Sequence, residues 1–106
     1  MADTLKRLEN IVAARRTGEP SQSYVASLTA KGRAKIAQKV GEEAVETVIA
    51  AMAGDRDGLV KEAADLIFHL AVLLADSGLS FDQVFAELDA REGTSGLAEK
   101  AARKDG

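Results

Sequence analysis

The chain has 106 residues, of which 46% are hydrophobic and 29% are charged, a composition typical of one globular domain. It holds no cysteine and one histidine, which excludes disulfides, thiolate nucleophiles and cysteine-based zinc sites. The charged N-terminus is unlike a signal peptide, and no apolar window is long enough to span a membrane. Aromatic residues are few and follow no basic run. We therefore expect a cytoplasmic protein with neither a nucleic-acid nor a membrane partner.

The formal net charge of -3 conceals two opposed regions. Residues 1–41 carry a net charge of +5, residues 42–76 carry -6, and residues 77–106 carry -2. The acidic region is therefore concentrated in the middle of the chain.

Apolar residues recur at helical spacing along almost the whole chain, and no segment alternates like a strand. The pattern predicts a first helix capped by Asp3 and ending near residues 17–18. A short second helix follows, capped by Ser21 or Ser23 and interrupted around Gly32.

A third helix is expected from about Arg33 to Ala53, and a fourth from Asp55 or Asp57 to Asp76. The third carries an apolar stripe of Ile36, Val40, Ala44, Val45, Val48, Ile49 and Met52. Residues 66–75 of the fourth are apolar except for His69, which indicates a buried helix.

Ser80 and Gln83 have the spacing of a capping box that opens a fifth helix. Its expected buried stripe is Phe81, Val84, Phe85 and Leu88. The fold class is therefore all-α, a bundle of about five helices over residues 1–92. Residues 93–106 are expected to form a flexible or partner-ordered tail. The motif at residues 91–96 has phosphate-binding donors but no P-loop context.

Five carboxylates occupy two short motifs in the third and fourth predicted helices. The motifs are E-E-x-x-E at residues 42–46 and E-x-x-D at residues 62–65. Because residues three apart share one face of a helix, Glu43 pairs with Glu46, and Glu62 pairs with Asp65. A turn within residues 53–58 would bring the two pairs face to face.

The fourth helix carries its acids on a narrow stripe. At about 100° per residue, Glu62, Asp65, His69 and Asp76 fall within an arc of about 60°. Burying unpaired carboxylates costs several kcal/mol of solvation free energy, roughly, for each group, so we expect a cation to lie against this stripe. Oxygen ligands without thiolates or a second imidazole favour Mg²⁺, with Mn²⁺ also compatible. For any single acid, the alternative to a metal ligand is an ordinary residue on a solvated helix face. A di-iron site is the alternative metal site, but it would need E-x-x-H pairs and therefore a second histidine.

The strings K-V-G-E-E-A-V-E at residues 39–46 and E-A-A-D-L-I-F-H-L-A-V-L-L at residues 62–74 resemble the phosphoribosyl-ATP pyrophosphohydrolase family. That family belongs to the all-α MazG-type nucleoside triphosphate pyrophosphohydrolases. The resemblance runs from about Leu5 to Leu88 and includes S-Y-V-A-S-L at residues 23–28. Val25 departs from it, because threonine is expected there. The resemblance implies hydrolysis of phosphoribosyl-ATP to phosphoribosyl-AMP and pyrophosphate, the second step of L-histidine biosynthesis.

The resemblance also implies the metal ligands, which are Glu43, Glu46, Glu62 and Asp65. Cleavage between the α and β phosphates needs an in-line water and positive charge on the phosphate oxygens. Glu42 and Glu46 are the catalytic candidates for accepting the proton of that water, and the sequence does not choose between them. The substrate-binding candidates are Lys39, Arg33, Lys61, Tyr24 and His69.

Each substrate-binding candidate has an ordinary structural alternative. Lys39 suits the leaving pyrophosphate, yet it also suits an ion pair with Glu43 four residues later. His69 would orient a ligand carboxylate or meet the substrate, or else be a hydrogen-bonded core residue. Tyr24 would stack on a base or ribose, or else pack.

One small core suggests that a second copy completes the fold, and members of the superfamily are dimers or tetramers. We therefore expect a homodimer. A house-cleaning nucleoside triphosphate pyrophosphatase with the same metal chemistry is the nearest alternative function. A helical interaction module without catalysis is the alternative from another class.

Overall fold

The computed structural model describes residues 2–93, which form five α-helices and no strand. The helices are α1 (Ala2–Arg15), α2 (Tyr24–Lys31), α3 (Arg33–Met52), α4 (Arg56–Asp76) and α5 (Phe81–Ala90). The expected all-α fold is confirmed. The tail expected at residues 93–106 lies outside the described residues, except for Gly93. None of the described helices is long and apolar enough to cross a membrane.

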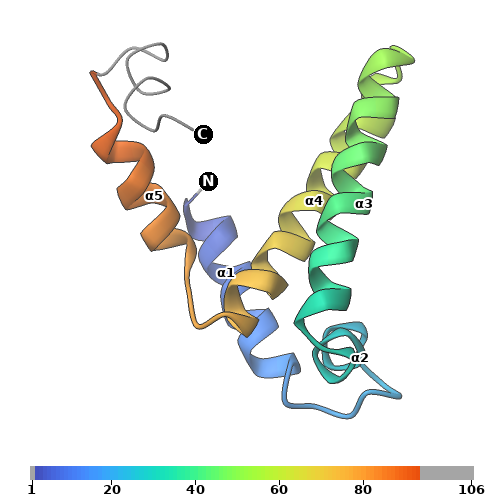
Figure 1. The fold of residues 1–106 in the computed structure, drawn as a ribbon, viewed down its shortest axis with the longest axis vertical. Coiled ribbons are helices and arrows are strands. Elements are labelled where there is room, and N and C mark those ends of the chain that lie inside the picture. The colour runs from blue at the N-terminus through green and yellow to red at the C-terminus, as the bar shows by residue number, and fades with distance from the viewer. Residues whose placement is uncertain (1, 94–106) are drawn as a thin grey trace.

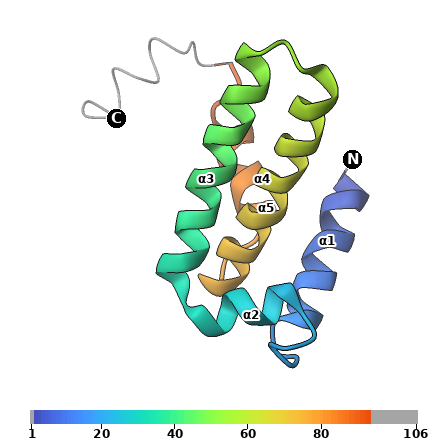
Figure 2. The same ribbon diagram turned by 90° about the vertical axis from the view of Figure 1, so that its right-hand side faces the viewer.

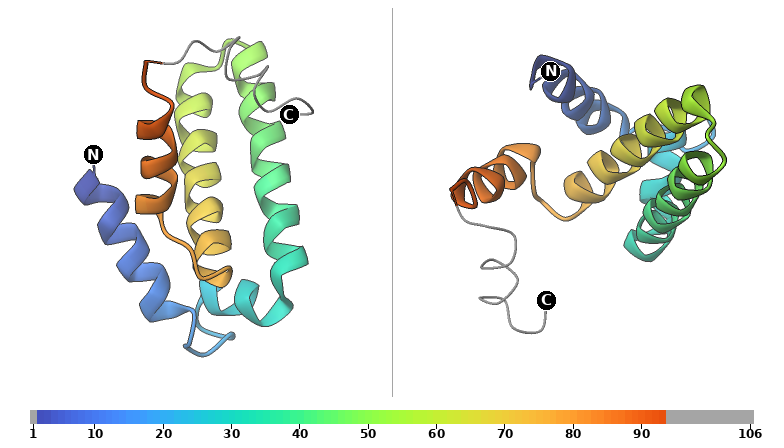
Figure 3. Two further views of the ribbon diagram at one scale, coloured as in Figure 1. Left: turned by 60° about the vertical axis from the view of Figure 1, so that its left-hand side comes forward. Right: turned by 90° about the horizontal axis from the view of Figure 1, so that it is seen from above.

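A long antiparallel hairpin of α3 and α4 is the main structural feature (Figures 1 and 2). The short helix α2 lies across the foot of this hairpin, and α1 packs against α4 (Figure 2). Helix α5 leads away from the hairpin, so the molecule is V-shaped in Figure 1, and the right-hand view of Figure 3 shows α5 apart from α3 and α4. The hairpin tip turns at Gly54, whose φ of 70° lies in the left-handed region that favours glycine.

The buried core lies where α1, α2, the start of α3, the end of α4 and the start of α5 meet. It consists of Val12, Val25, Leu28, Ile36, Ala71, Val72 and Phe81. Burying side chains of this size contributes about 1.5 to 3 kcal/mol each, so this junction holds the elements in place. Within residues 2–93, in contrast, the tip of the hairpin is formed by α3 and α4 alone (Figure 2).

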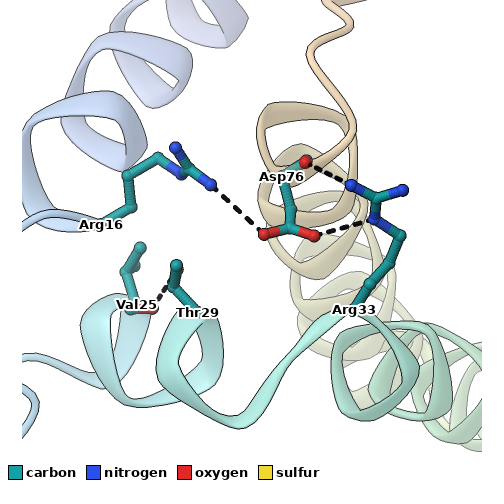
Figure 4. A network of polar contacts seen from close by, with 5 residues as sticks. All are labelled: Arg16, Val25, Thr29, Arg33 and Asp76. Atoms are coloured by element: carbon teal, nitrogen blue, oxygen red, sulfur yellow. Dashed lines mark hydrogen bonds and ion pairs between the residues drawn. The ribbon is translucent and has the colours of Figure 1, made fainter.

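At the foot of the hairpin, Asp76 of α4 bonds to Arg33 of α3 and to Arg16, the residue that directly follows α1 (Figure 4). Its carboxylate accepts hydrogen bonds from Arg16 at 3.2 Å and from the Nε of Arg33 at 2.9 Å. Arg33 also donates to the backbone carbonyl of Asp76 at 2.8 Å, which satisfies an unpaired carbonyl at the C-terminal end of α4. This network fixes the angle at which α1 and α3 approach α4.

The helix caps largely follow the sequence. Ser23 accepts from the backbone N–H of Ala26, and Asp55 accepts from that of Gly58, so these residues are the N-caps of α2 and α4. The side chain of Gln83 accepts from the N–H of Ser80, as expected of a capping box. The expected cap at Asp3 is wrong, because α1 already includes Ala2 and places Asp3 in its first turn.

The predicted apolar stripes are only partly buried in the described chain. On α3, Ile36 is buried, whereas Val45, Val48 and Ile49 are more than half exposed and Met52 is 83% exposed. Leu88 on α5 is exposed as well, which corrects its expected burial. Among the described helices, α4 alone packs against the tip half of α3, and the apolar stripe there is left exposed.

Candidate functional site

The α3–α4 hairpin brings the two acidic motifs together. Glu43 from α3 and Glu62 and Asp65 from α4 each offer one carboxylate oxygen, and these oxygens lie within 4.8 Å of one another. The antiparallel register explains this convergence, since each step forward along α3 is matched by a step backward along α4. The expected face-to-face arrangement of the two motifs is therefore present for three of the four proposed ligands.

Glu46 lies outside this close group, but it belongs to the same electrostatic cluster. The pKa of Glu62 is raised, first by partial burial and then by the negative charges of Glu43, Glu46 and Asp65. Within the described chain, no lysine or arginine forms an ion pair with Glu43, Glu62 or Asp65. Like charges at this spacing repel, and a hard divalent cation is the partner that their oxygens favour. The donor set therefore fits a metal ion.

Glu42 has different partners from its neighbour Glu43. Its carboxylate accepts from Gln38 at 2.7 Å and from the Nζ of Lys39 at 3.1 Å. These two hydrogen bonds lower the pKa of Glu42. Lys39 thus pairs with the acid three residues later, and the alternative of a pair with Glu43 four residues later is wrong. The sequence analysis did not predict Gln38 as a partner of Glu42, although residues four apart are in contact on a helix.

His69 joins α4 to α2 beneath the acidic group. It is 5% exposed, its Nδ1 lies 2.7 Å from the backbone carbonyl of Asp65, and its Nε2 lies 2.8 Å from the hydroxyl of Tyr24. A carbonyl only accepts, so Nδ1 carries the proton, and in the neutral ring Nε2 accepts from Tyr24. His69 is therefore a hydrogen-bonded core residue that touches the backbone of a proposed ligand and not its carboxylate.

Tyr24 is half exposed and packs on two rings of α4. Its ring stacks near Phe68 with centroids 6.1 Å apart and meets the edge of His69 at 5.6 Å. Burial raises the pKa of its hydroxyl, while the nearby charge of Lys39 lowers it. Glu43 also contributes to that shift, so Tyr24 lies within electrostatic reach of the acidic motif.

The two remaining substrate-binding candidates differ in their surroundings. Arg33 is engaged with Asp76 at the foot of the hairpin, away from the acidic group (Figure 4). Lys61 is exposed beside Glu62 on α4. Of these two, Lys61 is the one adjacent in sequence to a proposed ligand.

The chain resembles proteins of one family along nearly its whole length. A sequence model described as phosphoribosyl-ATP pyrophosphohydrolase matches residues 5–92. The chain belongs to the phosphoribosyl-ATP pyrophosphohydrolase family. A protein named phosphoribosyl-ATP pyrophosphatase from Rhizorhabdus wittichii is 70% identical to this chain over the full length of both. One of the same name from Novosphingobium aromaticivorans is 66% identical over 97% of this chain and 96% of the relative. A third protein of that name, from Zymomonas mobilis, is 65% identical over 95% of this chain and 94% of its own length.

Membership of the phosphoribosyl-ATP pyrophosphohydrolase family agrees with the resemblance seen in the acidic motifs. The matched range contains the whole hairpin and both motifs. At the one noted departure, Val25 is 3% exposed and packs in the core at the foot of the hairpin. Its apolar side chain is suited to that position, which needs no hydroxyl.

Proposed function

We propose that this chain hydrolyses phosphoribosyl-ATP to phosphoribosyl-AMP and pyrophosphate, the second step of L-histidine biosynthesis. The observation that carries the proposal is the convergence of Glu43, Glu62 and Asp65 on facing helices, in a chain that belongs to this family. The names of relatives that match it over 96 to 100% of their length support the same substrate.

We further propose that Glu43, Glu62, Asp65 and Glu46 hold Mg²⁺, for which Mn²⁺ is the nearest substitute. When bound, Mg²⁺ supplies positive charge to the phosphate oxygens and makes a water molecule more acidic. The three close carboxylates support this choice. The raised pKa of Glu62 also supports it, because the negative charges of its neighbours add to the effect of burial, and a cation would offset that repulsion.

Glu46 is the better candidate for accepting the proton of the attacking water. Both oxygens of Glu42 are engaged by Gln38 and Lys39, and its lowered pKa makes it a weaker base. Within the described chain, the side chain of Glu46 has no hydrogen bond or ion pair, and it is close enough to raise the pKa of Glu62. Glu42 is then the residue that positions Lys39.

Lys39 is the proposed cation for the leaving pyrophosphate. Its Nζ is held 3.1 Å from Glu42, one turn before Glu43 on α3. The hydrogen bond to Glu42 raises the pKa of Lys39, which keeps the ammonium charged. A phosphate oxygen would take one of the remaining N–H donors of this ammonium. Lys61 lies beside Glu62 and would supply a second charge from α4.

We also propose that the active form is a homodimer. The exposed apolar residues on the tip half of the hairpin support this, because large apolar patches on a monomer generally mark interaction sites. These residues are Val45, Val48, Ile49, Met52 and Val60. They lie on the two helices that carry the acids, so a second copy there would also shield the site from solvent.

The proposed function is tested by a substrate panel. The full chain is assayed for pyrophosphate release from phosphoribosyl-ATP, ATP and a set of deoxynucleoside triphosphates, with Mg²⁺ and with a chelator. We expect Mg²⁺-dependent release with phosphoribosyl-ATP strongly preferred. Cleavage of the other triphosphates alone would replace this proposal with the house-cleaning function. Absence of any turnover would favour the interaction module.

The acidic group is tested in the same assay. Asp65→Asn keeps the size of the side chain and removes its charge, and it should lower kcat by a factor of about 10² or more. Asp89→Asn, an exposed position on α5, is the matched control and should retain the wild-type rate.

A further inference from the structure

A cavity of about 560 Å³ opens beside Tyr24, outside the group of acids described above. The end of α1, the loop of residues 16–23, the start of α2 and Phe68 of α4 form its walls. Two charged side chains, Arg15 and Glu19, line it together with the rings of Tyr24 and Phe68. Within the described chain, neither Arg15 nor Glu19 has an ion pair or a side-chain hydrogen bond.

The loop that carries Glu19 is held by two turns. The N–H of Gly18 donates to the carbonyl of Arg15 at 3.0 Å, and the N–H of Gln22 donates to the carbonyl of Glu19 at 2.9 Å. Pro20 occupies the second position of the latter turn, where its fixed φ is favourable. These turns limit the loss of backbone entropy when a ligand binds at Glu19.

Tyr24 connects this cavity to the proposed phosphate site. Its hydroxyl is fixed by His69, which also bonds to the backbone of Asp65. Phe68 follows Asp65 by three residues and therefore shares its side of α4. A nucleotide whose phosphates lie at the acids would thus have its base near the two rings.

Phosphoribosyl-ATP differs from ATP at one position of the adenine. A phosphorylated ribose is attached to N1, and substitution there makes the ring much more basic than that of ATP. The substituted ring takes up a proton near neutral pH, whereas the adenine of ATP is neutral. The added ribose also carries its own 5′-phosphate, separate from the triphosphate, so this half of the substrate carries both a cation and an anion.

We propose that the cavity recognises the N1-substituted adenine and so separates phosphoribosyl-ATP from ATP. Tyr24 and Phe68 provide aromatic faces for a cationic ring, and Glu19 provides its counter-charge. Arg15 binds the 5′-phosphate of the added ribose. This inference rests on the proposed function, because it assigns the specificity of that same substrate.

The test of the cationic ring uses 1-methyladenosine and adenosine as probes, without Mg²⁺ and at neutral pH. Tyr24 is the one tyrosine of the chain, so ¹³C-labelled tyrosine gives a single ring signal to follow by NMR. We expect 1-methyladenosine to move this signal and to bind about tenfold more tightly than adenosine. Glu19→Gln should remove the preference, and Glu92→Gln, at an exposed position away from the cavity, should keep it.

Equal affinities for the two probes, an unmoved Tyr24 signal, or a preference that survives Glu19→Gln would each overturn the inference. These outcomes are independent of turnover. If the wild type hydrolyses phosphoribosyl-ATP and the probes fail to distinguish Glu19, the proposed function stands and the assignment of the cavity is wrong. If it does not hydrolyse phosphoribosyl-ATP, the proposed function itself fails.

The phosphate contact is tested separately with Arg15→Gln. We expect KM for phosphoribosyl-ATP to rise about tenfold with little change in kcat, because the contact lies far from the reacting bond. Arg7→Gln, on the same helix and outside the cavity, should leave KM unchanged. An unchanged KM in Arg15→Gln would remove Arg15 from the site.

Discussion

The hydroxyl of Tyr24 lies 2.8 Å from Nε2 of His69, and this hydrogen bond joins the short helix α2 to the buried face of α4. The other ring nitrogen of His69 bonds to the backbone of Asp65. A half-exposed aromatic residue is thereby held in a fixed position next to the acidic motif.

The Tyr24–His69 bond predicts a measurable coupling between these two residues. Tyr24→Phe removes the hydroxyl, and His69→Phe removes both ring nitrogens. Because the bond is part-buried, each single variant should lower the free energy of unfolding by about 1 kcal/mol or more, with a coupling of about 0.5 to 1.5 kcal/mol between them. Urea unfolding of the two single variants and the double variant measures this coupling. Strictly additive effects would show that the bond contributes nothing to stability.

Asp76 should be the most sensitive surface-accessible acid for stability. Its side chain is 15% exposed and accepts from two arginines, so Asp76→Asn should lower the free energy of unfolding by about 1 to 2 kcal/mol. Glu87→Gln is the control, because the pair of Glu87 with Arg91 is exposed and lies within one helix. Its effect should stay below about 0.5 kcal/mol. Similar values for both variants in urea unfolding would contradict the role of Asp76.

Glu62 should destabilise the metal-free protein at neutral pH. Its folded pKa is raised above its unfolded value, so its favourable contribution is complete below the unfolded pKa and is lost as pH rises through the folded pKa. Glu62→Gln should therefore raise the unfolding midpoint in a chelator, and the gain should shrink as the pH is lowered. Added Mg²⁺ should stabilise the wild type and have little effect on the variant. A variant less stable than the wild type in the chelator would contradict this account.

The apolar tip of the hairpin should control association. Ile49→Glu places a charge within the exposed stripe of α3 and should convert the proposed dimer to a monomer. Sedimentation or light scattering measures the mass. Ala30→Glu, at an exposed position on α2, is the control and should retain the dimer. A wild-type protein that is monomeric at assay concentrations and fully active would contradict the dimer proposal.

Local signals in the sequence were sufficient to predict the helices. Gly32, Gly54 and the caps Ser23 and Asp55 end or begin helices where their backbone chemistry requires it. The same helical spacing predicted that the acids of α3 and α4 converge, because antiparallel neighbours leave little freedom of register.

The features that could not be predicted depend on tertiary packing or on rotamers. Lys39 has acids both three and four residues ahead, and spacing alone did not show that Gln38 would help to hold Glu42 beside it. Periodicity identified the apolar stripe of α3 but not which part of it another element covers. The sequence predicted that the first helix ends near residues 17–18. The cavity that the loop of residues 16–23 forms with Phe68 could not be predicted in this way, because it depends on how α1, α2 and α4 meet.

We propose that this chain cleaves the bond between the α and β phosphates of phosphoribosyl-ATP at the acidic hairpin. The most direct measurement is ³¹P NMR of the products formed by the wild type and by Glu43→Gln with Mg²⁺ present. We expect phosphoribosyl-AMP and pyrophosphate from the wild type and a rate lower by a factor of about 10² or more in the variant. Release of inorganic phosphate in place of pyrophosphate, or an unimpaired Glu43→Gln, would contradict it.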